Sequence, residues 1–150
     1  MVDILVGGVN GTIKKQALVD TGAEVSLMPE HIAVQIGAWE TNQNMSIVDA
    51  NMNTKTLPII AAFIGFPELS KDVYKFPFGM HDLNQEIILG MDILKPTGIN
   101  IDTKNNKLTV KNEIWEAFKT IAGTGLLVYG GIRIIGAIFP DTPKSRKRRK

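Results

Sequence analysis

A succession of short apolar segments between residue 2 and about residue 111 most constrains the fold. Val2, Ile4 and Val6 occupy every second position, which is the spacing of a strand with one buried face. The pair Asn10-Gly11, favoured in tight hairpins, separates this segment from a second strand that ends at Val19. Many short strands with one short helix predict an all-β barrel or closed sandwich. Further strands are predicted at residues 25–28, 59–64, 73–78, 86–89, 98–102 and 107–111.

The single short helix and a long hairpin follow from local signals. Pro29 suits the first position of a helix, and Gly37 suits its end. Residues 45–60 predict a long hairpin whose tip lies near residues 51–53, because asparagine tolerates turn conformations well. Pro58 cannot donate a hydrogen bond to a ladder, so this hairpin is expected at a sheet edge, where it could move.

Composition narrows the classes of function. The 150 residues, 44% of them apolar and 21% charged, suit one domain with a real core plus an appendage. The absence of cysteine excludes disulfides and thiolate metal sites, and the isolated His31 and His81 predict solvent-facing or loop histidines and no metal site. Six of the last seven residues are basic, which leaves a net charge of 11 minus 15, or −4, on residues 1–143. This balance argues against a nucleic-acid-binding core.

One strand ends in an unusual group of residues. The apolar segment that closes at Val19 is followed by Asp20-Thr21-Gly22, a carboxylate, a small hydroxyl residue and the most flexible residue. Roughly 70 residues later, a second apolar segment meets a glycine in Ile87-Ile88-Leu89-Gly90. All three residues of the first group are turn formers, so the tripeptide is weak by itself and gains meaning from this second segment.

With ALVDTGAEVS at 17–26 and IILGMDIL at 87–94, the sequence resembles the retropepsin-like aspartic peptidases, the family of retroviral and retrotransposon proteases and their cellular relatives. The resemblance covers most of residues 2–111. It implies a closed acid-protease barrel, an apolar-apolar-Gly segment packed under the active-site loop, and a flap hairpin that closes on an extended peptide. Family members of this length carry one Asp-Thr-Gly per chain, so the implied enzyme is a homodimer that cleaves polypeptide substrates.

The resemblance also implies roles for individual residues. Asp20 of each subunit would share one proton with its counterpart and activate a water molecule, a mechanism that needs no metal or cofactor. Gly22 would offer its N–H to the carboxylates, and Thr21 would donate a hydrogen bond across the two-fold axis. The substrate would lie against Ala23 and beneath the flap residues Asp49, Ala50, Asn51, Met52 and Asn53. Structural support for the site would come from Leu89, Gly90 and Asp92.

Two departures from the family pattern keep a second function open. The tip at residues 49–53 has no glycine, although many flaps are rich in it, and Met91 stands where retroviral members usually carry an arginine. Asp92 is interpreted as a structural cap or a hydrogen-bond partner of the adjoining loop. The alternative function is therefore a non-catalytic dimerisation or peptide-binding module with the same barrel.

The sequence changes character after the domain at residues 1–111. Residues 112–139 predict one long helix that stops before Pro140, and residues 140–150 form a basic tail. Residues 121–139 carry a single charge and approach the length of a membrane span. Two alternatives remain: a transmembrane or dimerisation helix, which would make the protease membrane-associated and otherwise cytoplasmic, or a helix packed in water on the barrel or on a partner chain.

Overall fold

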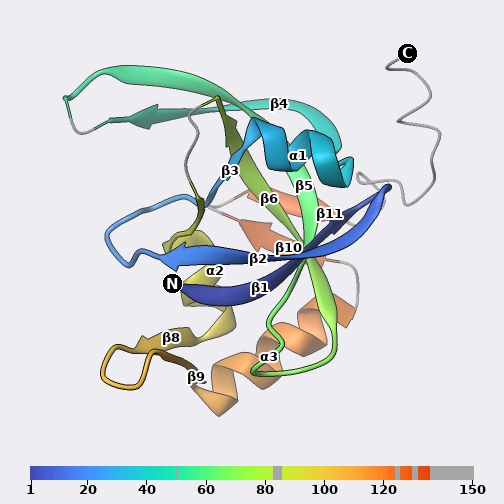
Figure 1. Cartoon of the computed structure of the whole chain (residues 1–150), viewed down its shortest axis with the longest axis vertical. Coiled ribbons are helices and arrows are strands. Elements are labelled where there is room, and N and C mark those ends of the chain that lie inside the picture. Colours follow the sequence, from blue (N-terminus) through green and yellow to red (C-terminus); the bar gives the residue numbers. More distant parts are fainter. Residues whose placement is uncertain (50, 83–85, 124–125, 130–131, 136–150) are drawn as a thin grey trace.

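The computed structural model describes residues 1–49, 51–82, 86–123, 126–129 and 132–135. Figure 1 shows a mostly β molecule with short helices on its outside. The helices are α1 (Glu30–Ile36), α2 (Met91–Thr97) and α3 (Asn112–Gly123). The strands are β1 (Val2–Gly8), β2 (Gly11–Val19), β3 (Leu27–Pro29), β4 (Trp39–Val48), β5 (Thr54–Gly65), β6 (Val73–His81), β7 (Ile87–Leu89), β8 (Ile99–Asp102), β9 (Lys107–Val110), β10 (Leu126–Tyr129) and β11 (Ile132–Ile135).

Six strands close into a barrel, which confirms the predicted fold class. The strand order is β1-β2-β7-β3-β6-β5, and β5 pairs back onto β1, so the ring has no open edge among these strands. Among the described strands, β4 pairs only with β5, and it extends the sheet outward. Closure removes the unpaired N–H and C=O groups that an open edge would present.

The first hairpin forms where the sequence predicts it, although its turn lies one residue before the pair Asn10-Gly11. β1 and β2 pair from Val2 opposite Ala17 to Gly8 opposite Gly11, and the turn lies at Val9-Asn10. Gly11 has a φ of +112°, a conformation that glycine adopts readily. Val2, Ile4 and Val6 are buried, as their alternation predicts.

The helix after β3 ends as predicted and begins at Glu30, one residue later than the predicted first helical position at Pro29. Pro29 precedes its first turn, and Gly37 closes it in the left-handed conformation with a φ of 67°. Its buried face consists of Ile32, Ala33 and Ile36. α2 was not predicted, because Pro96 lies inside it and proline is normally counted as a helix breaker.

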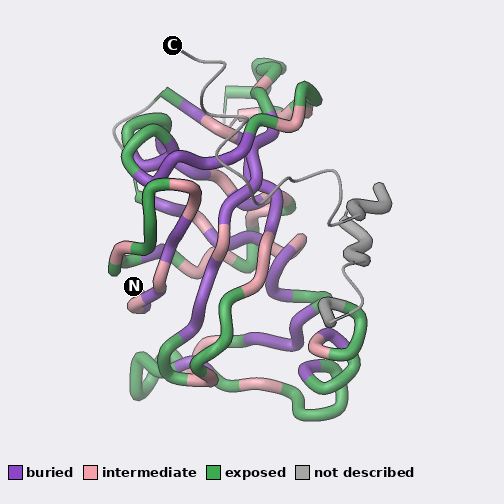
Figure 2. Tube along the Cα trace, turned by 90° about the vertical axis from the view of Figure 1, so that its right-hand side faces the viewer, coloured by how far each residue is buried: buried purple, intermediate pink, exposed green. Residues whose placement is uncertain are grey.

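The long hairpin is formed by β4 and β5, with its tip at residues 49–53. Figure 1 shows that it projects beyond the barrel on the side that also carries the β2–β3 loop. Pro58 lies opposite Asn44 in the edge strand β4, outside the part of β5 that pairs with β6, which is compatible with its missing N–H. Figure 2 shows buried residues concentrated in the middle of the molecule and exposed residues toward its ends.

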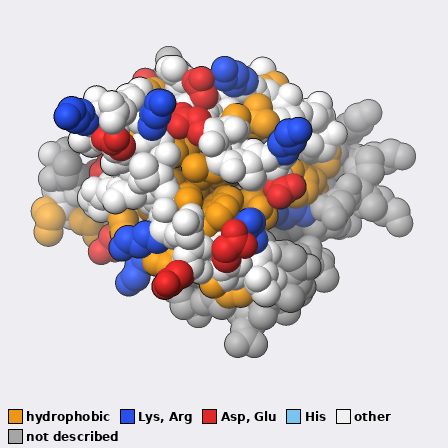
Figure 3. All heavy atoms as spheres, turned by 90° about the horizontal axis from the view of Figure 1, so that it is seen from below, with side chains coloured by type: hydrophobic (Ala, Val, Ile, Leu, Met, Phe, Trp, Pro, Cys, Tyr) orange, Lys and Arg blue, Asp and Glu red, His pale blue; other side chains and the backbone are white. Residues whose placement is uncertain are grey.

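An aromatic cluster fixes α3 to the barrel. Phe118 stacks on Phe76 of β6 with ring centroids 5.6 Å apart, and Tyr74 meets the edges of Trp115 and Phe118. Trp115 and Phe118 are both buried. Figure 3 views this end of the molecule and shows apolar side chains in its central part with acidic and basic side chains around them. Residues 112–123 therefore follow the second alternative, a helix packed on the barrel.

The prediction of one helix over residues 112–139 is wrong at residues 126–129 and 132–135. Residues 126–129 and 132–135 form the antiparallel strands β10 and β11, with Tyr129 opposite Ile132. Their sequences, LLVY and IRII, are rich in β-branched and aromatic residues, which favour strands over helices. In the described part of the chain no helix is long and apolar enough to cross a membrane, so a transmembrane helix at residues 121–139 is not supported. The predicted basic tail at residues 140–150 lies outside the described residues.

Candidate active site

The two sequence motifs meet on neighbouring strands. β2 and β7 run parallel, with Val19 opposite Leu89, so that both strands end at the same place. The Asp20 N–H continues this ladder and donates to the Leu89 carbonyl at 3.0 Å. Asp20 therefore comes directly after the last paired residue of β2. The sheet fixes the position of its backbone, and its side chain lies beyond the paired part of the strand.

The loop after β2 turns back on its own acid. The Gly22 N–H donates to Asp20 Oδ1 at 2.9 Å, as predicted, and the Ala23 N–H donates to the Asp20 carbonyl at 3.2 Å. Asp20 is half-buried, whereas Thr21 and Gly22 are exposed. The predicted hydrogen bond of Thr21 joins two subunits and stays a prediction for the single chain described here.

The second motif packs directly under this loop. The Met91 N–H donates to the Ala23 carbonyl at 2.8 Å, and the Asp92 N–H donates to the Glu24 carbonyl at 3.2 Å. A Cβ atom on Gly90 would lie 2.6 Å from the Val25 carbonyl oxygen. Only a residue without a side chain allows the strand end to approach the loop this closely.

Ser26 joins the two motifs from beneath the loop. It is fully buried; its Oγ donates to Asp92 Oδ1 at 2.5 Å and accepts from the Gly90 N–H at 2.9 Å. The Ser26 N–H donates to Asp92 Oδ2 at 2.6 Å. Asp92 is thus a hydrogen-bond partner of the adjoining loop, as predicted. Ser26 was missed, although its place within the motif ALVDTGAEVS could have drawn attention to it.

Replacing Ser26 with alanine tests how much this network stabilises the site. The change leaves the buried Gly90 N–H without an acceptor and removes one donor from Asp92. We expect the free energy of unfolding to fall by about 2 kcal/mol, because an unsatisfied buried polar group costs its full desolvation energy. Urea denaturation of wild type and S26A measures the difference, and S26T, which keeps the hydroxyl, is expected to recover part of it. Equal midpoints for wild type and S26A would contradict the role.

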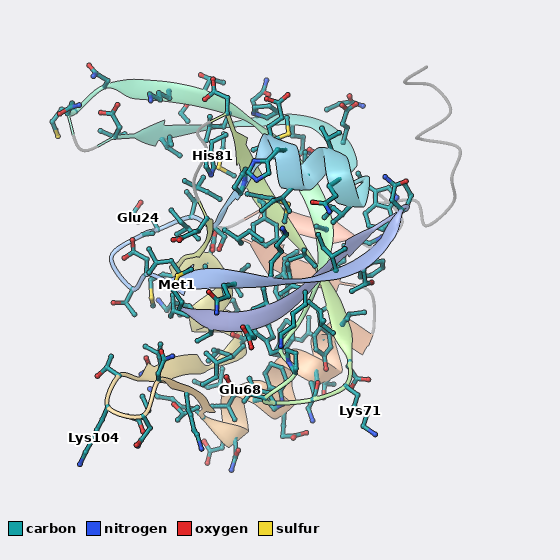
Figure 4. All side chains as sticks on the ribbon, in the orientation of Figure 1. Met1, Glu24, Glu68, Lys71, His81 and Lys104 are labelled. Carbon is teal, nitrogen blue, oxygen red and sulfur yellow. The ribbon has the colours of Figure 1, made fainter. Side chains whose placement is uncertain are left out.

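The flap stands apart from the acid in this structure. Figure 1 shows the tip of the β4–β5 hairpin well separated from the β2–β3 loop, on which Figure 4 labels Glu24. Asn51, Met52 and Asn53 are exposed, Asp49 is half-buried, and Ala50 lies outside the described residues. Nearer the barrel, Leu27, Met45 and Leu57 converge on buried Gly79, where a Cβ atom would lie within 3.4 Å of each of them. The structure therefore brings together the residues of the two motifs and leaves the predicted flap-tip residues apart from them.

The histidines differ from one another. His31 is exposed on α1 and agrees with the prediction of a solvent-facing side chain. The same prediction is wrong for His81, which is only 6% exposed, because β6 extends to this residue and pairs it with Pro29. Figure 4 places His81 beside α1. Within the part of the chain that the structure describes, neither ring nitrogen of His81 has a hydrogen-bond partner, and no three His, Asp or Glu side chains could together hold a metal ion.

The burial of His81 predicts an acid-sensitive fold. Burial lowers its pKa, an effect that nearby Asp82 opposes and His31 reinforces. The unfolded chain therefore binds a proton at a higher pH than the folded chain does, so stability decreases as the pH falls through the unfolded value. We expect the melting temperature of His81→Leu to drop less than that of wild type between about pH 7 and about pH 5. Parallel curves for the two proteins would contradict this expectation.

The chain is similar to known proteins in sequence and in fold. Residues 5–96 match the family described as gag-polyprotein putative aspartyl protease. The retroviral protease-like domain of Ddi1 from Leishmania major is 25% identical, with a TM-score of 0.52 over 75% of this chain and 89% of that domain. The EIAV protease, solved with an inhibitor, is 17% identical, with a TM-score of 0.43 over 63% of this chain and 83% of that protease. No curated protein matches the sequence.

The family model covers both motifs and most of the closed barrel. Asp20 lies at the end of β2, and Gly90 packs beneath its loop. The chain therefore belongs to the gag-polyprotein aspartyl protease family and has a retropepsin-like fold.

Proposed function

We propose that this protein is a homodimeric aspartic endopeptidase. The observation that carries the proposal is the half-buried Asp20 carboxylate, which accepts the Gly22 N–H directly above the Gly90 strand end. A carboxylate held in this way by a backbone donor is oriented before any substrate binds. Family membership supports peptide hydrolysis as the reaction.

A dimer supplies the second acid that the reaction needs. The sequence contains one Asp-Thr-Gly, so two Asp20 carboxylates meet only when two chains associate around a two-fold axis. Two carboxylates a few Å apart cannot both ionise easily, and they share one proton. The ionised carboxylate removes a proton from a water molecule that attacks the scissile carbonyl, and the protonated carboxylate donates to the oxygen on which negative charge develops.

The surrounding residues fit an extended peptide. Ala23, half-buried beside the acid, leaves space for the backbone of a substrate. The β4–β5 hairpin covers the bound peptide and pairs with it as an added strand. Thr21 hydrogen-bonds across the dimer axis and fixes the separation of the two acids.

The proposal is tested with the full chain and fluorescently labelled casein at mildly acidic pH. We expect cleavage that pepstatin, an inhibitor of aspartic peptidases, blocks completely. Specific activity should also fall on dilution in step with dimer dissociation followed by sedimentation. Cleavage that resists pepstatin, or specific activity that is constant after the dimer has dissociated, would refute the mechanism.

A non-catalytic peptide-binding module is the second candidate. The glycine-free flap tip and Met91 in place of an arginine favour it, since both depart from the pattern of cleaving relatives. In this case the purified dimer would bind unfolded casein and leave it intact from about pH 3 to about pH 7, the range over which paired carboxylates change charge.

A further inference from the structure

The flap tip is organised around one carboxylate. Asp49 Oδ1 accepts the N–H groups of Asn51 and Asn53, both at 2.9 Å. The backbone closes the same turn, because the Asp49 N–H donates to the Asn53 carbonyl at 2.9 Å and the Met52 N–H donates to the Asp49 carbonyl at 3.0 Å. The side chain of Asp49 is 24% exposed, so solvent reaches it only in part.

The tip adopts a conformation that its own residues disfavour. Met52 has a φ of +64°, in the left-handed region, although its side chain is bulky and 82% exposed. This conformation costs about 1–2 kcal/mol for a residue with a Cβ atom. The two N–H groups held by Asp49 lie on either side of Met52 in the sequence and oppose this cost. In a tip without glycine, the Asp49 carboxylate adds two hydrogen bonds to those that the backbone forms.

We propose that Asp49 is a positioning residue that pre-forms the flap tip for closure on an extended peptide. The inference rests on the proposed function and adds to it a residue that does not touch the reacting atoms. A flap tip that is already ordered loses less conformational freedom when the peptide binds, so the enzyme binds the peptide more tightly. A disordered tip would weaken substrate binding and leave the chemistry at Asp20 intact.

The charge of Asp49 suits the acidic range in which paired carboxylates work. The N–H of Asn53 lowers the pKa of Asp49 most, partial burial opposes this effect, and the N–H of Asn51 and the ammonium group of Lys55, 3.8 Å away, lower the pKa further. Because the pKa is lowered in the folded chain, the ionised acceptor persists at mildly acidic pH and is lost only as the pH falls through this lowered value. The tip is therefore expected to stay ordered at the pH where Asp20 is active.

The chain contains a matched control for removing the carboxylate. Asp102 forms a similar turn between β8 and β9, where its Oδ1 accepts the N–H groups of Lys104 and Asn105 at 3.0 and 3.3 Å. Figure 1 shows this turn at the opposite end of the molecule from the flap. Asp102→Ala thus removes the same kind of acceptor from a turn that does not cover the site.

The experiment combines amide exchange with kinetics on the full chain. In Asp49→Ala we expect the amide protons of Asn51 and Asn53 to exchange about tenfold faster and KM for casein to rise about tenfold, with kcat changed less than about twofold. Asp49→Asn keeps the Oδ1 acceptor and should recover part of both effects. Asp102→Ala should leave KM and the flap amides unchanged.

The outcomes distinguish a failure of the role of Asp49 from a failure of the proposed peptidase function. Unchanged exchange at Asn51 and Asn53 in Asp49→Ala would overturn the role of the carboxylate. Faster exchange with an unchanged KM would show that an ordered flap tip does not strengthen peptide binding. This result would also overturn the inference. A wild-type chain that never cleaves casein would refute the peptidase, and dissociation constants for unfolded casein would then replace KM in the same comparison.

Discussion

Asp20→Asn is expected to abolish proteolysis, with turnover reduced by about 10³-fold or more, because both acids of the dimer are lost at once. The amide of asparagine can still accept the Gly22 N–H through its oxygen, so the loop keeps its shape. It cannot share a proton with a second side chain or remove one from water. Turnover of labelled casein measures the loss, and an unchanged melting temperature establishes that the variant is folded.

Mixing subunits extends this prediction to the dimer. An excess of Asp20→Asn chains added to wild type should lower activity in proportion to the wild-type homodimers that are lost by exchange. A chain with a complete site of its own would keep its activity in the mixture. Activity that survives in the pure variant would remove the peptidase assignment altogether.

Gly90→Ala is expected to cost both stability and activity. The added methyl group would lie 2.6 Å from the Val25 carbonyl oxygen and 2.9 Å from the Ala23 carbonyl oxygen. These are backbone atoms, so the methyl group can be accommodated only if the loop that carries Asp20 moves. Gly90 has a φ of −97°, which any residue adopts, so the cost is steric. We expect the free energy of unfolding to fall by about 3 kcal/mol, as for overpacked cores, and turnover per folded molecule to fall with it.

Gly8→Ala separates these two effects. Its methyl group would overlap the carbonyl oxygens of Ile36 and Gly37, at the end of α1 and away from the Asp20 loop. We expect a similar loss of stability by urea denaturation, with turnover per folded molecule close to wild type. If both variants lost activity to the same extent, the effect of Gly90 on the site would be no more than general destabilisation.

Local signals in the sequence determined the barrel strands and the place of the acid. Alternating apolar residues predicted β1, Asn10-Gly11 predicted the turn before β2, and Pro29 and Gly37 predicted the limits of α1. These features depend on residues that are adjacent in the sequence and on their backbone preferences, so a single sequence is enough to predict them. The motif at Asp20 likewise consists of consecutive residues, so its chemistry could be predicted from the sequence without knowledge of the residues that surround it in the fold.

Only the tertiary structure decided how distant segments support that chemistry. The hydrogen bonds of Ser26 to Asp92 and Gly90 join residues more than 60 positions apart, and they depend on the parallel pairing of β2 with β7. The burial of His81 and the docking of α3 through Phe118 also arise from contacts across the fold. The helix predicted over residues 112–139 is wrong at β10 and β11 for a different reason, because an apolar segment suits either a helix or a strand and its β-branched and aromatic residues favour the strand.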